Sequence, residues 1–245
     1  MNNFANQHWT SCGVTHEGKV RKLNEDAFLD RREIGLWVVA DGMGGHDAGD
    51  YASRRIIEAL KSITAPDRLS DYVNIVDDKV SEINAELRAF SRDYHDNRTV
   101  GSTAVILLAC DNYCSLLWAG DSRAYRYRTG QLTQLTRDHS QVEELIEQGV
   151  LNRKDAESHP EANIITRAVG ATDQLFLEVD VVEVETGDIF LLCSDGLYKH
   201  LSTNDIAHIL AGSDITKNCQ NLIDLTLERG AKDNVTVILA QALAS

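Results

Sequence analysis

Aspartates stand at the ends of the most apolar segments of this 245-residue sequence. Asp41, Asp121 and Asp195 each follow an apolar run and are each followed by glycine or serine, and Asp233 comes just before such a run. In an antiparallel sheet, a residue that ends one strand and a residue that begins its neighbour lie at the same edge. The spacing therefore predicts that these carboxylates converge at one edge.

A single Asp-Gly pair is most often a surface turn, and for an isolated case the turn is the better interpretation. Several carboxylates brought within a few ångström would repel one another and raise each other's pKa. A bound divalent cation removes that repulsion. Oxygen-only ligands favour Mg²⁺ or Mn²⁺, and the eight histidines show no HxH or HExxH spacing of the kind that zinc sites use. We expect two such cations sharing Asp41, about 3.5–4 Å apart.

A second charged group, Arg21 followed by Glu25 and Asp26, lies upstream. One interpretation is a solvated loop with a local ion pair, which adds little stability. The other gives Arg21 a planar guanidinium for bidentate binding of an oxyanion, with the acids holding metal-bound water. The spacing alone leaves both interpretations open.

The glycine-rich stretch 41–50 fits neither of two common phosphate-binding motifs. Asp47 stands where a dinucleotide-binding fingerprint needs glycine, and Asp50 stands where a phosphate-binding loop needs lysine. The glycines more plausibly let the backbone approach the predicted metal site closely. The Gly42 carbonyl is therefore a candidate ligand.

Apolar runs and periodic segments must position these acids. Strand-like runs are joined by expected hairpin turns at Asp111-Asn112 and Thr129-Gly130. Strands that cluster apart from paired amphipathic helices predict an α+β layered fold. The polar segment 139–162 breaks the pattern and is expected to be a small mobile excursion. The predicted strands cover 9–15, 36–40, 102–109, 115–119, 124–127, 175–184, 189–193 and 235–240, and the predicted helices cover 48–63, 72–90, 204–210 and 214–229.

Composition excludes several classes of function. Lys and Arg total 24 against 38 Asp and Glu, and the formal net charge of −14 disfavours nucleic acids and anionic membranes as partners. No apolar run approaches the roughly 20 residues of a membrane helix, and the N-terminus lacks the features of a signal peptide. The five cysteines contain no CxxC pair. We therefore expect one cytoplasmic domain with reduced thiols.

Eight motifs follow one another along the chain: Arg21-x-x-Asn24-Glu25-Asp26, Asp41-Gly42-Met43-Gly44-Gly45, Gly101-Ser102-Thr103-Ala104, Gly120-Asp121-Ser122-Arg123-Ala124-Tyr125, Leu135-Thr136-x-Asp138-His139-Ser140, Ile165-Thr166-Arg167-Ala168-Val169-Gly170, Ser194-Asp195-Gly196-Leu197 and Asp233-Asn234-x-Thr236. This series resembles the PP2C-type (PPM family) metal-dependent protein serine/threonine phosphatases, in their compact bacterial branch. The resemblance implies a four-layer α-β-β-α sandwich of two antiparallel β-sheets flanked by helix pairs. It also implies a single PP2C-like phosphatase domain over residues 1–245, with a flap subdomain at about 140–162.

The resemblance assigns a role to each acidic residue. Asp41 is implied to bridge two metal ions and to activate water, and Arg21 to bind the phosphate. Asp121 is similar to a residue that, with Asp195, binds a third and weaker ion in bacterial members. The implied metal ligands are Glu25, Asp41, the Gly42 carbonyl, Asp121, Asp195 and Asp233, and Asp26 is implied to support them.

The implied reaction is hydrolysis of phosphoserine and phosphothreonine in proteins, by in-line attack of a metal-activated water at a dinuclear Mn²⁺ or Mg²⁺ centre. Expected partners are phosphorylated proteins, above all a bacterial serine/threonine kinase that the enzyme opposes and the targets of that kinase, and we expect a monomer. Met43 stands where eukaryotic relatives have a histidine. Metal-bound water is then the first candidate to protonate the leaving group, and His46 is a distant second.

Two other classes of function compete with this one. A silent domain of the same fold would bind phosphoproteins or act as a scaffold, but silent relatives lose metal ligands and this chain retains all of them. A two-metal nuclease is disfavoured by the net charge of −14 and the lack of a basic stripe. The retained ligands favour the phosphatase.

Overall fold

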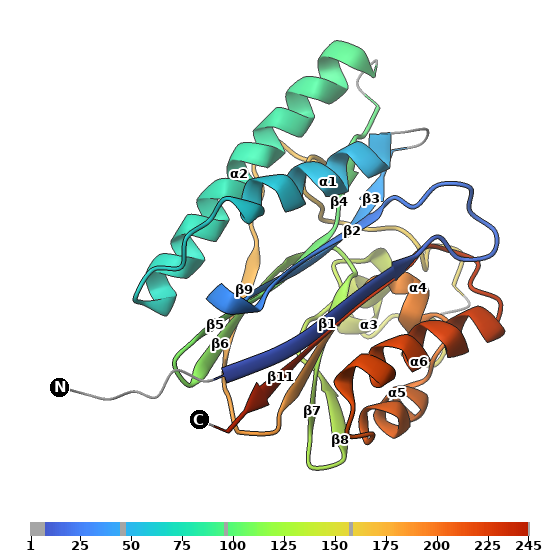
Figure 1. The fold of residues 1–245 in the computed structure, drawn as a ribbon. Helices are drawn as coiled ribbons and strands as arrows, with labels where there is room; N and C mark the ends of the chain where they lie inside the picture. Colours follow the sequence, from blue (N-terminus) through green and yellow to red (C-terminus); the bar gives the residue numbers. More distant parts are fainter. Residues whose placement is uncertain (1–7, 45–47, 96–97, 157–158, 245) are drawn as a thin grey trace.

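Two β-sheets packed face to face form the centre of the protein, and helices cover their outer faces (Figure 1). A computed structural model describes residues 8–44, 48–95, 98–156 and 159–244. Every strand pair in the two sheets is antiparallel. This confirms the predicted α+β class and the four layers.

The first sheet contains both ends of the described chain. Its strands are, in spatial order, β1 (His8–His16), β11 (Val235–Leu243), β10 (Ile189–Cys193), β7 (Arg123–Arg128) and β8 (Gln131–Gln134). The helices of this half are α4 (Asp195–Tyr198), α5 (Thr203–Leu210) and α6 (Ile215–Glu228). Apolar residues of α5 and α6 pack against one face of β10 and β11, which gives this sheet its own outer core.

The second sheet carries the longer helix pair. Its strands are, in spatial order, β2 (Asp26–Arg31), β3 (Leu36–Met43), β5 (Ala104–Cys110), β6 (Tyr113–Ala119) and β9 (Glu178–Glu183), and the short β4 (Gly101–Ser102) also pairs with β3. A 3₁₀ turn, η1 (Arg32–Ile34), joins β2 to β3. The outer face of this sheet is covered by α1 (Ala48–Lys61) and α2 (Leu69–Tyr94).

Alternation along the central strands divides the core into layers. Trp37 and Val39 of β3 face the other sheet, where they join a buried cluster with Phe190 of β10. Val38 and Ala40, the residues between and after them, face the helix layer instead. Because successive side chains on a strand point to opposite faces, strands buried on both sides need continuous apolar runs. This explains why β3 and β10 are so apolar.

Most predicted elements are observed, and the differences are local. The two expected hairpin turns join β5 to β6 and β7 to β8, with positive φ at Asp111, Thr129 and Gly130. Strands β2 and β8 and the short α4 were not predicted. The expected strand over 175–184 is shorter, because β9 covers only Glu178–Glu183. The polar segment 139–162 contains a helix, α3 (Gln141–Glu147), that the sequence analysis missed.

None of the helices in the described ranges combines the length and the apolar character needed to cross a membrane. All five cysteines are free thiols.

Candidate active site

Asp26 and Asp41 are direct neighbours at one edge of the second sheet. β2 begins at Asp26, and the antiparallel register pairs that residue with Asp41 near the end of β3. The backbone of Asp41 is fixed by Thr103, whose N–H donates to the Asp41 carbonyl over 2.8 Å and whose Oγ1 accepts from the Asp41 N–H over 3.0 Å. These bonds use the main chain of Asp41 and not its carboxylate.

Asp195 and Asp233 belong to the first sheet, where they flank neighbouring antiparallel strands. β10 ends at Cys193, Asp195 opens α4, and Asp233 lies just before β11. Ser194 joins the two sheets at this edge, since its hydroxyl donates to Asp26 Oδ2 over 2.7 Å. The strand ends of both sheets therefore meet here. The sequence analysis expected one sheet edge, whereas these acids come from the edges of two stacked sheets.

The carboxyl pKa values of three acids in this cluster are raised by burial and by neighbouring negative charges. Burial, and then the charges of Asp26, Asp195 and Asp121, raises the pKa of Asp41 well above its ordinary value. Burial also raises the pKa of Asp26 to about 7 and the pKa of Asp121 to about 7, and Asp195 adds to both shifts. Like charges thus add to the raised pKa values of Asp26, Asp41 and Asp121, and a bound cation would relieve that repulsion.

The donor groups at this edge fit a hard cation. Glu25 Oε1 and Asp26 Oδ1 are shielded from solvent and have no hydrogen-bond partner among the described residues. Burial raises the pKa of Glu25. The backbone is close-packed here: a Cβ added to Gly49 would lie 2.3 Å from Glu25 Oε1, and one added to Gly42 would lie 2.1 Å from the Gly49 carbonyl oxygen. Buried, unpartnered carboxylate oxygens beside a glycine-lined backbone are suited to Mg²⁺ or Mn²⁺.

Two basic side chains hold the remaining acids. Arg21 Nη2 lies 2.7 Å from Asp233 Oδ2, so its ion pair is with a residue 212 positions away and is not the local pair considered above. Lys199 Nζ lies 2.5 Å from Asp195 Oδ2. In the described parts of the chain, no three His, Cys, Asp or Glu side chains are grouped as a ready set of metal ligands. A cation that binds Asp233 Oδ2 has to compete with Arg21, and a cation that binds Asp195 Oδ2 has to compete with Lys199.

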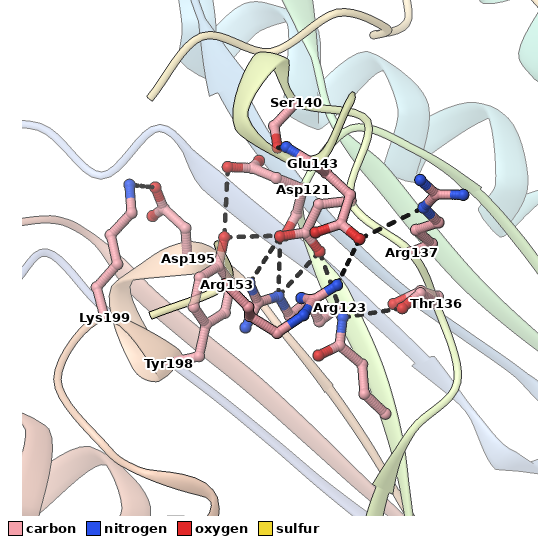
Figure 2. Close-up of polar contacts among 12 residues, drawn as sticks. Asp121, Arg123, Thr136, Arg137, Ser140, Glu143, Arg153, Asp195, Tyr198 and Lys199 are labelled. Carbon is pink, nitrogen blue, oxygen red and sulfur yellow. Dashed lines mark hydrogen bonds and ion pairs between the residues drawn. The ribbon is translucent and has the colours of Figure 1, made fainter. Parts of the chain in front are cut away.

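Asp121 is buried and belongs to a polar network whose other members are partly buried (Figure 2). The Tyr198 hydroxyl lies 3.1 Å from the Asp121 carbonyl oxygen and 3.3 Å from Asp121 Oδ2. The guanidinium carbon of Arg123 lies 3.5 Å from the centre of the Tyr198 ring. Arg123 in turn donates to Asp138 from Nη2 over 2.7 Å and from Nε over 2.9 Å. The network fixes the tyrosine ring against Asp121.

The segment expected to form a flap, about 140–162, and the residue just after it lie beside the cluster. Its helix α3 is capped by Ser140, whose side chain accepts from the Glu143 N–H, and Ser140 also forms a β-bridge with Ile165. Between these anchors, Asn163 Oδ1 accepts a hydrogen bond of 2.7 Å from Lys199 Nζ. The same lysine therefore contacts both the acidic cluster and this segment.

Three residues of the site were missed by the sequence analysis: Ser194, Tyr198 and Lys199. Lys199 follows Asp195 by four residues, which is the spacing of an ion pair on a helix. That signal was hidden because α4 spans only four residues and shows no periodic pattern. His46, the second candidate for proton donation, lies outside the described residues.

The raised carboxyl pKa values predict how stability depends on pH when no cation is bound. Between about pH 4 and pH 7 the folded protein holds more protons on Asp26, Asp41 and Asp121 than the unfolded chain does, so the free energy of unfolding falls as pH rises. His139 acts in the opposite direction, because burial lowers its pKa, but one histidine is outweighed by three acids. Chelator-treated protein is expected to lose more than about 1.4 kcal/mol between pH 5 and pH 8, the value of one pKa unit. Urea unfolding at the two pH values measures this.

Added Mn²⁺ should restore stability at pH 8 more than at pH 5, because only the ionised acids bind it well. An unfolding free energy that stays constant or rises between pH 5 and pH 8 in the chelator-treated protein would contradict the clustering of these acids.

Comparison with known proteins matches nearly the whole chain. The family model described as Protein phosphatase 2C matches residues 12–243. The serine/threonine phosphatase stp of Listeria monocytogenes serotype 4b (strain F2365) is 33% identical over 235 residues, which cover 93% of this chain and 93% of that protein. The similarity therefore extends over both sheets and is not confined to one motif.

Two solved structures share the fold. PppA, a key regulatory component of T6SS in Pseudomonas aeruginosa, matches with a TM-score of 0.89 at 43% identity, covering 96% of this chain and 98% of that one. The catalytic domain of the serine/threonine protein phosphatase PstP, in complex with two manganese ions, matches with a TM-score of 0.86 at 31% identity, covering 98% and 100%.

Proposed function

Because the chain belongs to the protein phosphatase 2C family, we propose that it hydrolyses phosphoserine and phosphothreonine in proteins at a centre of two divalent cations. The observation that carries the proposal is the convergence of Asp26 and Asp41 with Asp195 at the edge where both sheets end. Acids that raise one another's pKa at one place are costly unless they bind a cation. The two manganese ions of the PstP catalytic domain support a centre of the same kind here.

The residues of the cluster divide between two cations. Asp41 is proposed to bridge them, because acids from both sheets lie near enough to its carboxylate to raise its pKa. A third cation at Asp121 and Asp195 would have to displace Lys199 from Asp195. The proposed ligands are Glu25, Asp41 and the Gly42 carbonyl for the first cation and Asp41, Asp195 and Asp233 for the second, with Asp26 supporting Asp41 from the adjacent strand.

Bound divalent cations would lower the pKa of a water so that it attacks phosphorus in line, and they would neutralise charge on the phosphoryl oxygens. Arg21 does the rest of the binding. Its side chain is 51% exposed, so it can leave Asp233 when a cation takes that carboxylate and present its planar guanidinium to two phosphoryl oxygens. Binding of a cation to Asp233 would therefore also free Arg21 to bind the substrate phosphate.

Protonation of the departing seryl or threonyl oxygen has no assigned side chain. Met43, at the end of β3, has no proton to give, and we assign this step to water. A catalytically silent domain is disfavoured as the alternative. A domain of this fold that had lost its activity would also have lost metal ligands, and this sequence retains every acidic residue proposed as a ligand.

The physiological substrates are proposed to be phosphoproteins made by a bacterial serine/threonine kinase, which this enzyme would oppose. The similarity to PppA, described as a key regulatory component of T6SS, supports a regulatory role. The five free thiols support a reducing compartment such as the cytoplasm, and we propose that the enzyme acts there as a monomer.

Removal and return of metal tests the proposed activity. Chelator-treated protein should leave p-nitrophenyl phosphate and a phosphothreonine peptide intact, and Mn²⁺ or Mg²⁺ should restore hydrolysis by at least about 100-fold, since the cations supply the activated water. An oligonucleotide should stay uncut under the same conditions. Release of phosphate is the measurement, and failure with every divalent cation tried would reject the phosphatase.

Replacing Arg21 with alanine should lower kcat/KM about 100-fold, the usual cost of losing one positioned donor to a developing anion. Arg21→Lys should recover part of the rate, because lysine keeps the charge but not the bidentate geometry. Lys22→Ala, which removes the same charge one residue away, should behave like the parent enzyme. An equal loss in Lys22→Ala would mean that Arg21 acts only through long-range charge.

A further inference from the structure

Two consecutive residues at the C-terminal end of α4 hold two different acids of the cluster. The Tyr198 hydroxyl is bonded to Asp121, and Lys199 Nζ is bonded to Asp195 Oδ2 over 2.5 Å (Figure 2). Asp121 follows β6 and Asp195 follows β10, so the dipeptide joins the ends of strands from the two sheets. The arrangement is more specific than a surface ion pair between neighbours on a helix.

The lysine charge acts on more than its hydrogen-bonded partner. Burial works to lower the pKa of Lys199, but Asp195, Asp121 and Asp233 outweigh it and raise that pKa. In the other direction, Lys199 is the cation that opposes the rise in the pKa of Asp121. An ammonium group thus already sits where these carboxylates would otherwise repel one another.

Lys199 also reaches the 140–164 segment. Its Nζ donates to Asn163 Oδ1 over 2.7 Å, and the chain next to Asn163 is fixed by the bond from the Gln141 N–H to the Ile164 carbonyl, 2.9 Å long. The side chain is 36% exposed and sits between Asp195, which is 14% exposed, and this segment. Whatever displaces the ammonium from Asp195 also loosens its hold on Asn163.

We propose that the Lys199 ammonium is the built-in counter-cation of Asp195 and Asp121, so that a further divalent cation binds this pair only by displacing Lys199 and releasing Asn163. The inference rests on the proposed two-cation centre and deepens it. Lys199 is a positioning residue. Its ammonium group prevents a cation from binding between Asp121 and Asp195, and its hydrogen bond to Asn163 holds the segment that carries α3 against the cluster. Cation occupancy at this pair and the order of residues 159–166 would then be coupled.

The test counts Mn²⁺ ions bound per chain, by isothermal titration calorimetry with the loss of free Mn²⁺ followed by electron paramagnetic resonance. Lys199→Met keeps an unbranched side chain as far as Cε and removes the ammonium group. It should bind one more Mn²⁺ than the parent, or bind the last Mn²⁺ at least about tenfold more tightly, since a competing unit charge has gone. Lys199→Gln is the second variant if the methionine disturbs folding, and Lys199→Arg, which keeps the charge, should behave like the parent.

Two controls fix the place of the added ion. Lys79→Met removes a lysine that pairs with Glu82 on α2, and it should leave Mn²⁺ binding unchanged. Adding Asp121→Asn to Lys199→Met should remove the gain. Equal binding by the parent and Lys199→Met, or a gain that survives Asp121→Asn, would overturn the proposal.

Hydrogen exchange gives a readout independent of catalysis. Lys199→Met and Asn163→Ala should both speed amide exchange over residues 159–166. Asn163→Ala should tighten Mn²⁺ binding by less than Lys199→Met does, because it removes the bond to Asn163 but leaves the Lys199 charge on Asp195. Exchange that is the same in the parent and in Lys199→Met would overturn the coupling. Failure of the proposed function is a separate result: the parent would neither bind Mn²⁺ nor hydrolyse phosphate esters. The comparison of the parent with Lys199→Met uses Mn²⁺ binding and hydrogen exchange and does not depend on activity.

Discussion

Asp41→Asn is expected to lower Mn²⁺-dependent kcat/KM by at least about 1,000-fold, which corresponds to about 4 kcal/mol of transition-state stabilisation. The charges of four other aspartates at the cluster raise the pKa of Asp41. Asparagine has one neutral carbonyl oxygen in place of the two charged oxygens of the carboxylate. A bridging position needs two oxygen donors with charge. Rates with p-nitrophenyl phosphate across a range of Mn²⁺ concentrations measure the loss, and excess Mn²⁺ should not recover it.

The same variant should be more stable than the parent without metal at pH 8. Replacing a carboxylate whose pKa is raised by burial and by like charges removes repulsion. Lower activity combined with higher stability separates a lost ligand from a misfolded protein. Asp30→Asn, at the far end of β2 where Asp30 accepts from Ser11, is the matched control and should keep full activity. A variant of Asp41 that is inactive because it is unfolded would not support the assignment.

Strands that are buried on both faces could be predicted from the sequence. β10 is observed at Ile189–Cys193, as expected, because every residue in it is fully apolar and covered on both sides. β8 (Gln131–Gln134) has one apolar residue and lies at a sheet edge, so nothing in its composition sets it apart from a loop. β2 (Asp26–Arg31) begins and ends with charged residues, since one end contributes to the acidic cluster. The hydrophobic pattern of the sequence therefore predicts the buried strands but not the strands at the sheet edges.

That aspartates at the ends of neighbouring strands share a sheet edge could be predicted, because it depends only on strand direction, and the register of Asp26 with Asp41 is an example. The bond from Ser194 to Asp26 depends on the stacking of the two sheets, which strand direction does not encode. The pairs that now hold the acids could not be predicted. Arg21 and Asp233 are 212 residues apart, and their contact depends on how loops leave the sheets, which no local pattern encodes.

Arg123→Met is expected to lower the free energy of unfolding by about 3–4 kcal/mol, the cost of leaving one partner of a buried ion pair without the other. Arg123 and Asp138 are 22% and 11% exposed and are joined by a bond of 2.7 Å from Nη2 to Oδ2. Without the guanidinium, Asp138 keeps a hydrogen bond of 3.4 Å from the Gln134 amide. The change also removes the group stacked on the Tyr198 ring. Urea unfolding of the metal-free protein measures the difference.

A matched bidentate pair on the surface distinguishes burial from pairing. Arg68 binds Asp71 through Nε and Nη2, each over 2.8 Å, but these side chains are 74% and 39% exposed. Arg68→Met should therefore leave the unfolding free energy unchanged within error, because water solvates the remaining carboxylate. In the core, Arg123→Met combined with Asp138→Leu should recover much of the stability lost in the single variant, since no buried charge remains without a partner. Equal losses in Arg68→Met and Arg123→Met would show that the pair near Tyr198 is held no more tightly than one in solvent, and the fixed position of the tyrosine beside Asp121 would then need another source.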